Sequence, residues 1–396
     1  MIPHGSKKSI TSLYQSKNNG AVHNDFQRDV YCLFGFPVDN LSLKSTENLL
    51  KNNVSACQQI VLSTVNVNWI VTSLKSPEFR AAVLNSDICI LDGMPLLILS
   101  HCLGLPMREV VSGSSLCEHL LQKGDAQNPL SIFLFGGNSD TAENAFIKIN
   151  SSAKGLKAVG HCNPGFGSIK TMSENSFIQR INSSSPDILL VALGAHKGVL
   201  WIERNRNKLN SHIISHLGAT IDFLAGTVKR APLFFQKTAL EWLWRIAKEP
   251  SLFRRYLDDG LFLFGELISR FLFFFKYIRL KKRYGQKAGK PIILMSENHD
   301  WITLKFGEHF NFPQKAFVQQ TFYEVALKKK NIVLDFDKTE FVDSAFLAYL
   351  LLLLKHQNRN NRVVKVYNIR NNLQKIFCFN FVTHSLNSLD ISIDFN

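Results

Sequence analysis

Between residues 30 and 226, short runs of consecutive apolar residues alternate with amphipathic stretches. The stretch from Asp187 to Gly194, which reads DILLVALG, is typical, because its apolar residues follow one another instead of alternating with polar ones. A strand of this kind is buried on both faces, as in a parallel sheet covered by helices. The pattern predicts an α/β fold with a Rossmann-like doubly wound sheet. We expect its strands at residues 60–65, 88–91, 131–135, 156–160, 188–193 and 213–217, with helices such as 141–151 between them.

Composition and patterning divide the chain into successive segments. The polar N-terminus has no apolar stretch of the kind that a secretory signal needs. Near residue 285 the sequence GQKAGKP indicates a linker, and strand and helix patterns alternate again beyond it. The predicted segments are a disordered arm over residues 1–28, the main domain over 29–228, a basic helical appendage over 229–284, the linker over 285–291 and a small α/β domain over 292–396.

The cysteines and other potential metal ligands of the sequence do not follow the spacing of a known metal site or disulfide framework. Seven cysteines are scattered along the chain without a CxxC pair, which is expected of reduced thiols in a cytoplasmic protein. The sequence Asp335-Phe336-Asp337 looks like a metal-binding DxD, but we interpret it as a strand end in the second domain. We therefore expect no metal ion and no other cofactor.

Positive charge is concentrated in one part of the chain. Residues 229–287 hold 14 lysines and arginines against 5 acidic residues, and so contribute +9 to a formal net charge of +15. Such a concentration predicts an anionic partner, which could be a nucleic acid, an anionic membrane surface or a phosphorylated substrate. The alternative is a solvated amphipathic helix. Nothing else in the chain indicates nucleic-acid binding.

The end of this basic segment is rich in phenylalanine. Residues 257–283 read LDDGLFLFGELISRFLFFFKYIRLKKR. A membrane span is disfavoured because Glu266 and Arg270 interrupt the apolar run, each at a cost of about 2.5–3.5 kcal/mol at a bilayer centre. An interfacial helix fits better, with phenylalanines in the lipid and Lys281, Lys282 and Arg283 on anionic headgroups. The alternative is a helix that packs on its own domain.

Candidate binding residues stand where predicted strands end. Gly136 and Gly137 follow one strand, and Gly194 ends another. Glycines there let backbone N–H groups approach a phosphate, and ligands of doubly wound sheets bind at this edge. Asp92 follows the apolar run ICIL and could act as a partly desolvated general base. Taken alone, each feature is also explained by a tight turn.

A series of residues near the end of the main domain adds a family resemblance. In chain order they are Asp222, Gly226, Arg230-Ala231-Pro232, Glu241-Trp242, Arg245, Glu249-Pro250 and Arg255-Tyr256. This series resembles the C-terminal signature of the WecG/TagA/CpsF glycosyltransferases, and the likeness extends back to about Val30. The T-x-N and D-G motifs of that family match Thr64-Val65-Asn66 and Asp92-Gly93.

The resemblance implies roles for individual residues. Thr64 and Asn66 would contact the substrate, and Asp92 would be the catalytic base. Arginines would hold the diphosphate of the nucleotide sugar, because a guanidinium forks onto phosphate through paired hydrogen bonds. No metal is needed if these arginines neutralise the leaving group. They are Arg230, Arg245, Arg254 and Arg255, and the substrate site would also include Gly136, Gly137, Gly194 and His196.

The family also implies a function. It is inverting, metal-independent transfer of an N-acetylhexosamine-type sugar from a UDP-sugar to a polyprenyl-diphosphate-linked saccharide. The products of the family are cell-surface polysaccharides, such as teichoic-acid linkage units and exopolysaccharide. Such an acceptor stays in the bilayer, so we expect a cytoplasmic enzyme that binds peripherally to the inner face of the bacterial cell membrane.

One departure from the family pattern bears on this function. The family carries proline, glutamine and glutamate where this chain has His196, Gly198 and Val199. His196 could replace a lost hydrogen bond to the donor, or it could be an ordinary loop histidine. The alternative function is a catalytically degenerate regulatory protein that switches between partners through its second domain.

Residues 331–353, which read NIVLDFDKTEFVDSAFLAYLLLL, resemble the STAS domain of the anti-sigma-factor antagonists. Ser344 matches the serine that is phosphorylated there, and a phosphate would meet a helix N-terminus favourably. Alternatively, Ser344 is the N-cap of that helix. The helix is more hydrophobic than a free surface needs, which predicts docking to another surface. The domain could also bind a protein partner.

Overall fold

The computed structural model describes residues 24–138, 140–152, 154–228, 231–232, 234–235, 238, 240–285, 291–389 and 391–393. A six-stranded sheet lies in its first part, with every neighbouring pair parallel, in the order β4-β3-β8-β7-β5-β6. The predicted Rossmann-like α/β sheet is therefore confirmed. Its strands are β3 (Ile60–Val65), β4 (Ile88–Leu91), β5 (Leu130–Gly136), β6 (Leu156–Cys162), β7 (Ile188–Ala192) and β8 (Ile213–His216).

Both faces of this sheet are buried. Along β5, Ile132 and Leu134 belong to the core on one face, whereas Phe133 and Phe135 belong to the core on the other. Successive side chains of a strand point to opposite faces, so a strand covered on both sides is apolar throughout. The surrounding helices are α1 (Leu43–Ser55), α2 (Val67–Lys75), α3 (Pro77–Leu84), α4 (Met94–Cys102), α5 (Gly113–Lys123), α6 (Thr141–Ser152), α7 (Asn175–Ser183), α8 (Ala195–Asn205) and α9 (Thr220–Ala225).

The C-terminal unit has a sheet of its own, in the order β15-β14-β12-β10-β9. Only β9 runs antiparallel to its neighbour. The strands are β9 (Ile293–Glu297), β10 (Trp301–Phe306), β12 (Asn331–Asp335), β14 (Val364–Tyr367) and β15 (Ser392–Ile393), and β11 (His309–Phe310) pairs with β13 (Phe341–Val342). The helices are α13 (Lys315–Leu327), α14 (Ser344–Arg359), α15 (Asn371–Phe379) and α16 (Val382–Ser388).

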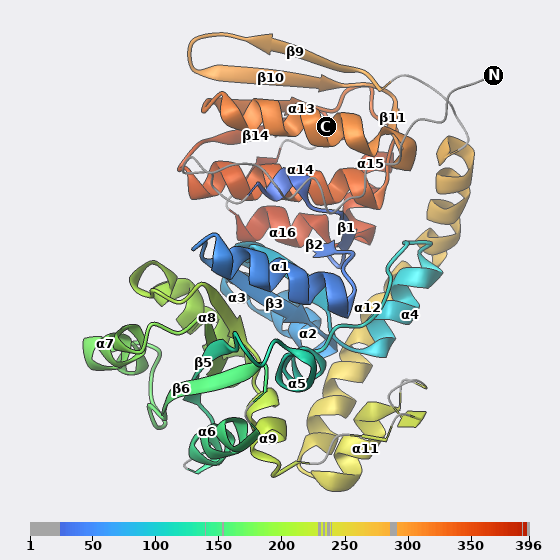
Figure 1. The fold of residues 1–396 in the computed structure, drawn as a ribbon. Helices are drawn as coiled ribbons and strands as arrows, with labels where there is room; N and C mark the ends of the chain where they lie inside the picture. The colour runs from blue at the N-terminus through green and yellow to red at the C-terminus, as the bar shows by residue number, and fades with distance from the viewer. Residues whose placement is uncertain are drawn as a thin grey trace, which may run out of the picture.

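A β-hairpin at the start of the described chain joins the two units. It consists of β1 (Val30–Leu33) and β2 (Phe36–Asp39), and it packs against α14. Figure 1 shows the hairpin and α16 between the lower, N-terminal unit and the upper, C-terminal unit. A single hydrophobic core runs through hairpin, α3 and α14. The docking predicted from the apolar sequence of α14 is therefore confirmed, and its surface is the hairpin of the same chain.

The expected disordered arm over residues 1–28 is wrong at its end. Asp25–Gln27 form a 3₁₀ helix, η2, in which Phe26 is buried in the shared core. Arg28 is also buried and pairs with Asp25 at 2.8 Å and Asp39 at 2.7 Å. Burial of the aromatic ring and the paired charges holds this segment in place. Residues 1–23 lie outside the described part of the chain.

The basic appendage forms α11 (Glu241–Lys248) and α12 (Leu252–Gly285). In Figure 1, α12 runs along the side of the molecule past both units, with α4 beside it. One face of α12 packs on the body, because Leu263 and Tyr277 are buried in the shared core. No helix among the described residues is long and apolar enough to cross a membrane.

Candidate active site at the carboxyl edge of the parallel sheet

The ends of β3 and β4 bring two candidate residues together. The strands are adjacent and parallel, with Val65 opposite Leu91, so Asn66 and Asp92 occupy equivalent positions just beyond them. The backbone N–H of Asp92 donates to the carbonyl of Val65 at 2.8 Å. Thr64 is buried one position inside the strand, while Asn66 and Asp92 are half-buried. The structure thus places Thr64, Asn66 and Asp92 at one edge, as the sequence predicted.

Two helices begin at this edge. Asn66 is the N-cap of α2, and its Oδ1 accepts a hydrogen bond from the Trp69 N–H at 3.1 Å. Gly93 is the N-cap of α4 with a φ of 109°, a conformation that favours glycine. The first N–H groups of a helix carry a partial positive charge. The edge next to Asp92 therefore suits a diphosphate, which is an anion.

The two glycines at the end of β5 have a structural function at the same edge. Gly136 and Gly137 have φ values of 102° and 84°. The Gly137 N–H donates to the carbonyl of Ala192 at 2.9 Å, and a Cβ on Gly136 would lie 2.4 Å from that oxygen. The pair therefore lets the ends of β5 and β7 approach closely. Gly194 has open space where a Cβ would stand, so a ligand could approach its backbone.

His196 is held against α3. Its Nε2 lies 3.3 Å from Ser76 Oγ, and its ring stacks on Phe79 with centroids 5.8 Å apart. The side chain remains exposed. These contacts account for His196 as an ordinary surface histidine, and its contact with the donor stays a prediction.

The departure at Gly198 has a counterpart that sequence reasoning missed. A Cβ on Gly198 would lie 2.0 Å from Cδ2 of His216, so the histidine ring occupies the space next to the glycine. His216 ends β8, is buried, and packs on Trp69 with centroids 5.8 Å apart. Burial lowers the pKa of His216 to about 4, which makes the ring neutral at neutral pH. A histidine at the end of an apolar strand was the available signal.

This packing makes a prediction about stability. Gly198→Ala should lower the free energy of unfolding by about 1–3 kcal/mol, because the new methyl overlaps the His216 ring. In a His216→Ala background the same change should have almost no cost, since the ring is gone. Chemical unfolding of the two single variants and the double variant measures the coupling. Gly260→Ala on α12, where a Cβ meets nothing, is the control. A Gly198→Ala protein as stable as this control would contradict the packing.

The arginines of the appendage have different surroundings. Arg245 lies 3.6 Å from Glu249 and over the ring of Phe223 at 5.9 Å, and its buried Nε has no hydrogen-bond partner among the described residues. It stands near Asp222, where burial and the Glu249 charge raise the pKa of the carboxyl. An unpartnered guanidinium nitrogen beside α9 is suited to an anionic ligand.

The other three arginines that the family resemblance implies differ in their surroundings. Arg255 precedes Asp259 by one turn of α12, and Asp259 accepts a hydrogen bond at 2.9 Å from Asn68, two residues after Asn66. Arg255 itself is exposed, and its guanidinium lies over the ring of Tyr256 at 5.3 Å. The side chain of Arg254 is 92% exposed and lies 4.0 Å from Asp258. Arg230 lies outside the described residues.

The carboxylates expected at a strand end in the second domain are used in ion pairs there. Asp335 ends β12, 3.8 Å from Lys305, and Asp337 pairs with Arg370 at 3.1 Å. Within the described ranges, no three histidine, cysteine, aspartate or glutamate side chains are grouped to hold a metal ion. Metal independence stays a prediction.

Ser344 is not on the surface. Its Oγ donates to the carbonyl of Cys32 in β1 at 2.9 Å, and the residue is only 4% exposed. The N-cap of α14 is Asp343, which accepts from the Phe346 N–H at 2.9 Å, so the alternative of Ser344 as N-cap is wrong. Burial raises the pKa of Asp343 to about 6. Phosphorylation of Ser344 would require α14 to separate from the hairpin.

Comparison with known proteins adds a family match. The model of the glycosyl transferase WecG/TagA/CpsF family matches residues 31–274. Two relatives named N-acetylglucosaminyldiphosphoundecaprenol N-acetyl-beta-D-mannosaminyltransferase come from Bacillus spizizenii and Bacillus subtilis. The first is 27% identical over 230 residues, which cover 56% of this chain and 86% of the relative. The second is 25% identical over 227 residues, which cover 57% and 86%. A protein of the same name from Staphylococcus aureus is 22% identical over 234 residues, which cover 59% and 90%.

Proposed function

Because the chain belongs to the WecG/TagA/CpsF family of glycosyltransferases, we propose that it transfers an N-acetylhexosamine-type sugar from a UDP-sugar to a polyprenyl-diphosphate-linked saccharide. The names of its relatives describe transfer of N-acetylmannosamine to a diphosphoundecaprenol-linked N-acetylglucosamine. The observation that carries the proposal is the pairing of Asn66 and Asp92 at adjacent strand ends, beside the start of two helices.

The proposed reaction is a single displacement. Asp92 accepts the proton of the acceptor hydroxyl while that oxygen attacks the anomeric carbon from the side opposite to UDP. The bond between the anomeric carbon and the UDP oxygen breaks, UDP leaves, and the anomeric configuration inverts. The helix N-termini at Asn66 and Gly93, with Arg245 and Arg255, stabilise the negative charge that develops on UDP. Thr64 and Asn66 orient the sugar.

Product formation tests this function. The full-length protein is incubated with diphosphopolyprenol-linked N-acetylglucosamine and a panel of UDP-N-acetylhexosamines, and UDP release is followed with mass spectrometry of the lipid product. We expect one donor to give a product larger by one N-acetylhexosamine, and proton NMR to show the inverted anomer. No product with any donor would favour the alternative, a degenerate regulatory protein, for which the Gly198-Val199 departure and the attached C-terminal unit are the supporting features.

For the C-terminal unit, we propose a STAS-like domain with a structural function. Support comes from its mixed sheet with one antiparallel edge strand, and from the helix that begins directly after Asp343. Its longest helix is buried against the hairpin of the catalytic unit. A partner-switching function would need this interface to open, and any protein partner would otherwise bind the outer surface of the unit.

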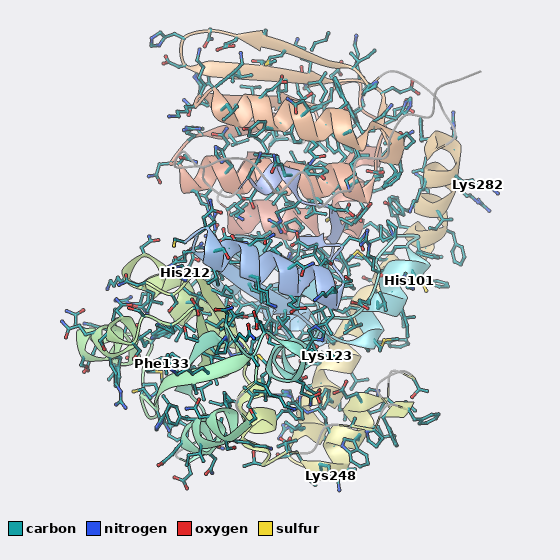
Figure 2. All side chains as sticks on the ribbon, viewed as in Figure 1. His101, Lys123, Phe133, His212, Lys248 and Lys282 are labelled. Atoms are coloured by element: carbon teal, nitrogen blue, oxygen red, sulfur yellow. The ribbon has the colours of Figure 1, made fainter. Side chains whose placement is uncertain are left out.

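We also propose that the edge formed by α11 and α12 binds an anionic membrane surface at the cytoplasmic face. Exposed apolar side chains recur every three or four residues along α12, which places them on one side of the helix. They are Phe253, Leu257, Leu261, Phe264, Ile268, Phe271, Leu272 and Phe275, and we call them the apolar stripe. Figure 2 shows Lys248 and Lys282 with their side chains pointing outward near opposite ends of this edge.

Liposome flotation tests the membrane proposal. The protein should float with vesicles that contain anionic lipid and should dissociate as salt rises, because each lysine or arginine near such a surface contributes about 1 kcal/mol. Replacing Phe264 and Leu272 of the apolar stripe by serine should weaken binding severalfold. Leu294→Ser in β9, also an exposed leucine, is the control. Binding that is equal for both variants would contradict docking through α12.

A further inference from the structure

An apolar cavity of about 230 Å³ lies between the two units. Its walls include Leu99 and Cys102 of α4, Phe271 and Phe274 of α12, and Phe379 and Phe381 of the C-terminal unit. A water molecule needs only about 10–15 Å³ of such space, so the cavity is large enough for part of an organic ligand. Cavities with apolar walls hold apolar groups in preference to water.

The cavity is connected to the candidate active site by two helices. The first, α4, begins directly after Asp92 and Gly93 and ends at the cavity with Cys102, which gives a separation of about 13 Å. The second, α12, contacts the sheet edge through the hydrogen bond of Asp259 with Asn68 and then passes the cavity. Beyond the cavity, Lys281 donates to the carbonyls of Leu103 and Gly104 at 2.8 and 2.9 Å. Figure 2 shows His101 on this stretch of α4, beside α12.

The charged side chain in the cavity wall already has partners, so the cavity does not require a charged ligand. Arg270 is its charged residue, and the guanidinium donates to the carbonyl of Glu266 at 2.9 Å and lies 4.0 Å from the centre of the Phe381 ring. Its charge is therefore already balanced by Glu266 and an aromatic face. Phe34 and Phe381, which also line the cavity, both have positive φ and pack with ring centroids 5.2 Å apart. Such a backbone is uncommon for large residues.

We propose that this cavity binds the isoprenoid chain of the lipid-linked acceptor. The proposal rests on the proposed function, and it adds that the C-terminal unit supplies one wall of the acceptor site. The reacting N-acetylglucosamine of the acceptor lies beside Asp92, its diphosphate lies along α4, and the first isoprene units enter the cavity. The rest of the chain leaves beside Phe271, which belongs to both the cavity and the apolar stripe. A protein helix, about 10 Å across, is too thick for this volume.

The first experiment measures acceptor selectivity. Two acceptors carry the same N-acetylglucosamine diphosphate, one on a long polyprenyl chain and one on a single isoprene unit. In Cys102→Trp, the added indole fills the cavity, and the ratio of kcat/KM for the long over the short acceptor should fall about tenfold or more. Ile98→Trp is the matched control, because it adds the same group to an exposed position of α4 outside the cavity walls. A ratio in Cys102→Trp equal to that of the control would overturn the proposal.

The second experiment needs no transferase activity. Cys57 and Cys378, the other exposed cysteines among the described residues, are replaced by serine, and alkylation of Cys102 by N-ethylmaleimide is timed in detergent-free buffer. Farnesyl diphosphate should slow alkylation at least severalfold, and inorganic diphosphate should not. Equal rates with both would overturn the proposal. Protection of Cys102 without sugar transfer would reject the proposed function but support isoprenoid binding in the cavity. Sugar transfer without protection of Cys102 and without a change in acceptor selectivity would support the proposed function but reject isoprenoid binding in the cavity.

Discussion

Asp92→Asn is expected to lower the turnover of sugar transfer by about 10²–10⁴-fold, which is the usual contribution of a general base. Asparagine has nearly the shape of aspartate but accepts no proton at neutral pH. The backbone of this position is set by the hydrogen bond to Val65 and by the turn at Gly93, which the substitution leaves in place. The dissociation constant of the UDP-sugar should therefore change little. Single-turnover kinetics and calorimetry measure the two quantities separately.

Asp337→Asn is the control for this experiment. Asp337 is an exposed carboxylate in the C-terminal unit that pairs with Arg370, and it is the second aspartate of the DxD sequence. Turnover close to wild type is expected, because Asp337 belongs to the C-terminal unit and not to the candidate active site. A strong loss of activity in this variant would instead support metal chemistry at Asp335 and Asp337. Near-wild-type turnover in Asp92→Asn would exclude Asp92 as the base.

Asp87→Ala is expected to destabilise the protein by about 3–5 kcal/mol, because removing one partner of a buried ion pair leaves the opposite charge uncompensated. Asp87 is 4% exposed and lies at the junction of the two units. It pairs with Arg206 at 2.6 Å and with Arg359 of α14 at 3.0 Å, and it accepts from the Val61 N–H at 2.8 Å. Urea unfolding measures the loss.

The control for Asp87→Ala is Glu297→Ala, which also removes a carboxylate that pairs with two cationic side chains. Glu297 pairs with Lys328 and Lys330 at an exposed site of the C-terminal unit, where solvent weakens such pairs. Glu297→Ala should therefore cost only a small fraction of the Asp87→Ala effect. Equal losses in the two variants would contradict a special role for the buried charge. Two separate unfolding transitions in wild type would contradict the shared core.

The Asp87 effect should depend on pH. Burial by itself would raise the pKa of Asp87, but the charges of Lys355, Arg206 and Arg359 outweigh it and hold the pKa well below the usual range. A carboxyl whose pKa is lower in the folded than in the unfolded state stabilises the fold above its unfolded pKa of about 3.9. The difference in stability between wild type and Asp87→Ala should thus be constant near neutral pH and decrease as pH falls below about 4.

The parallel sheet and the grouping of Thr64, Asn66 and Asp92 were both predictable from sequence. Continuous apolar runs depend on burial on both faces, which is a property of each strand. The bounds of β3 and β4 equal the predicted ones, and the other four strands differ from those runs by one or two residues at their ends. Because the carboxyl ends of parallel strands meet at one edge, residues that follow those runs come together without further information.

The tertiary structure decided the features that depend on distant contacts. Ser344 bonds to Cys32, which is 312 residues away, so its burial has no local signal. In the sequence Gly198 is the loss of a side chain, whereas in the structure the His216 ring fills the adjacent space.

The sequence by itself thus determined the α/β sheet, the family and the edge that carries Asp92, since these follow from local periodicity and motifs. The tertiary structure decided that the two units share one core and together line a cavity. Side-chain packing between segments far apart in the chain has no local pattern to reveal it.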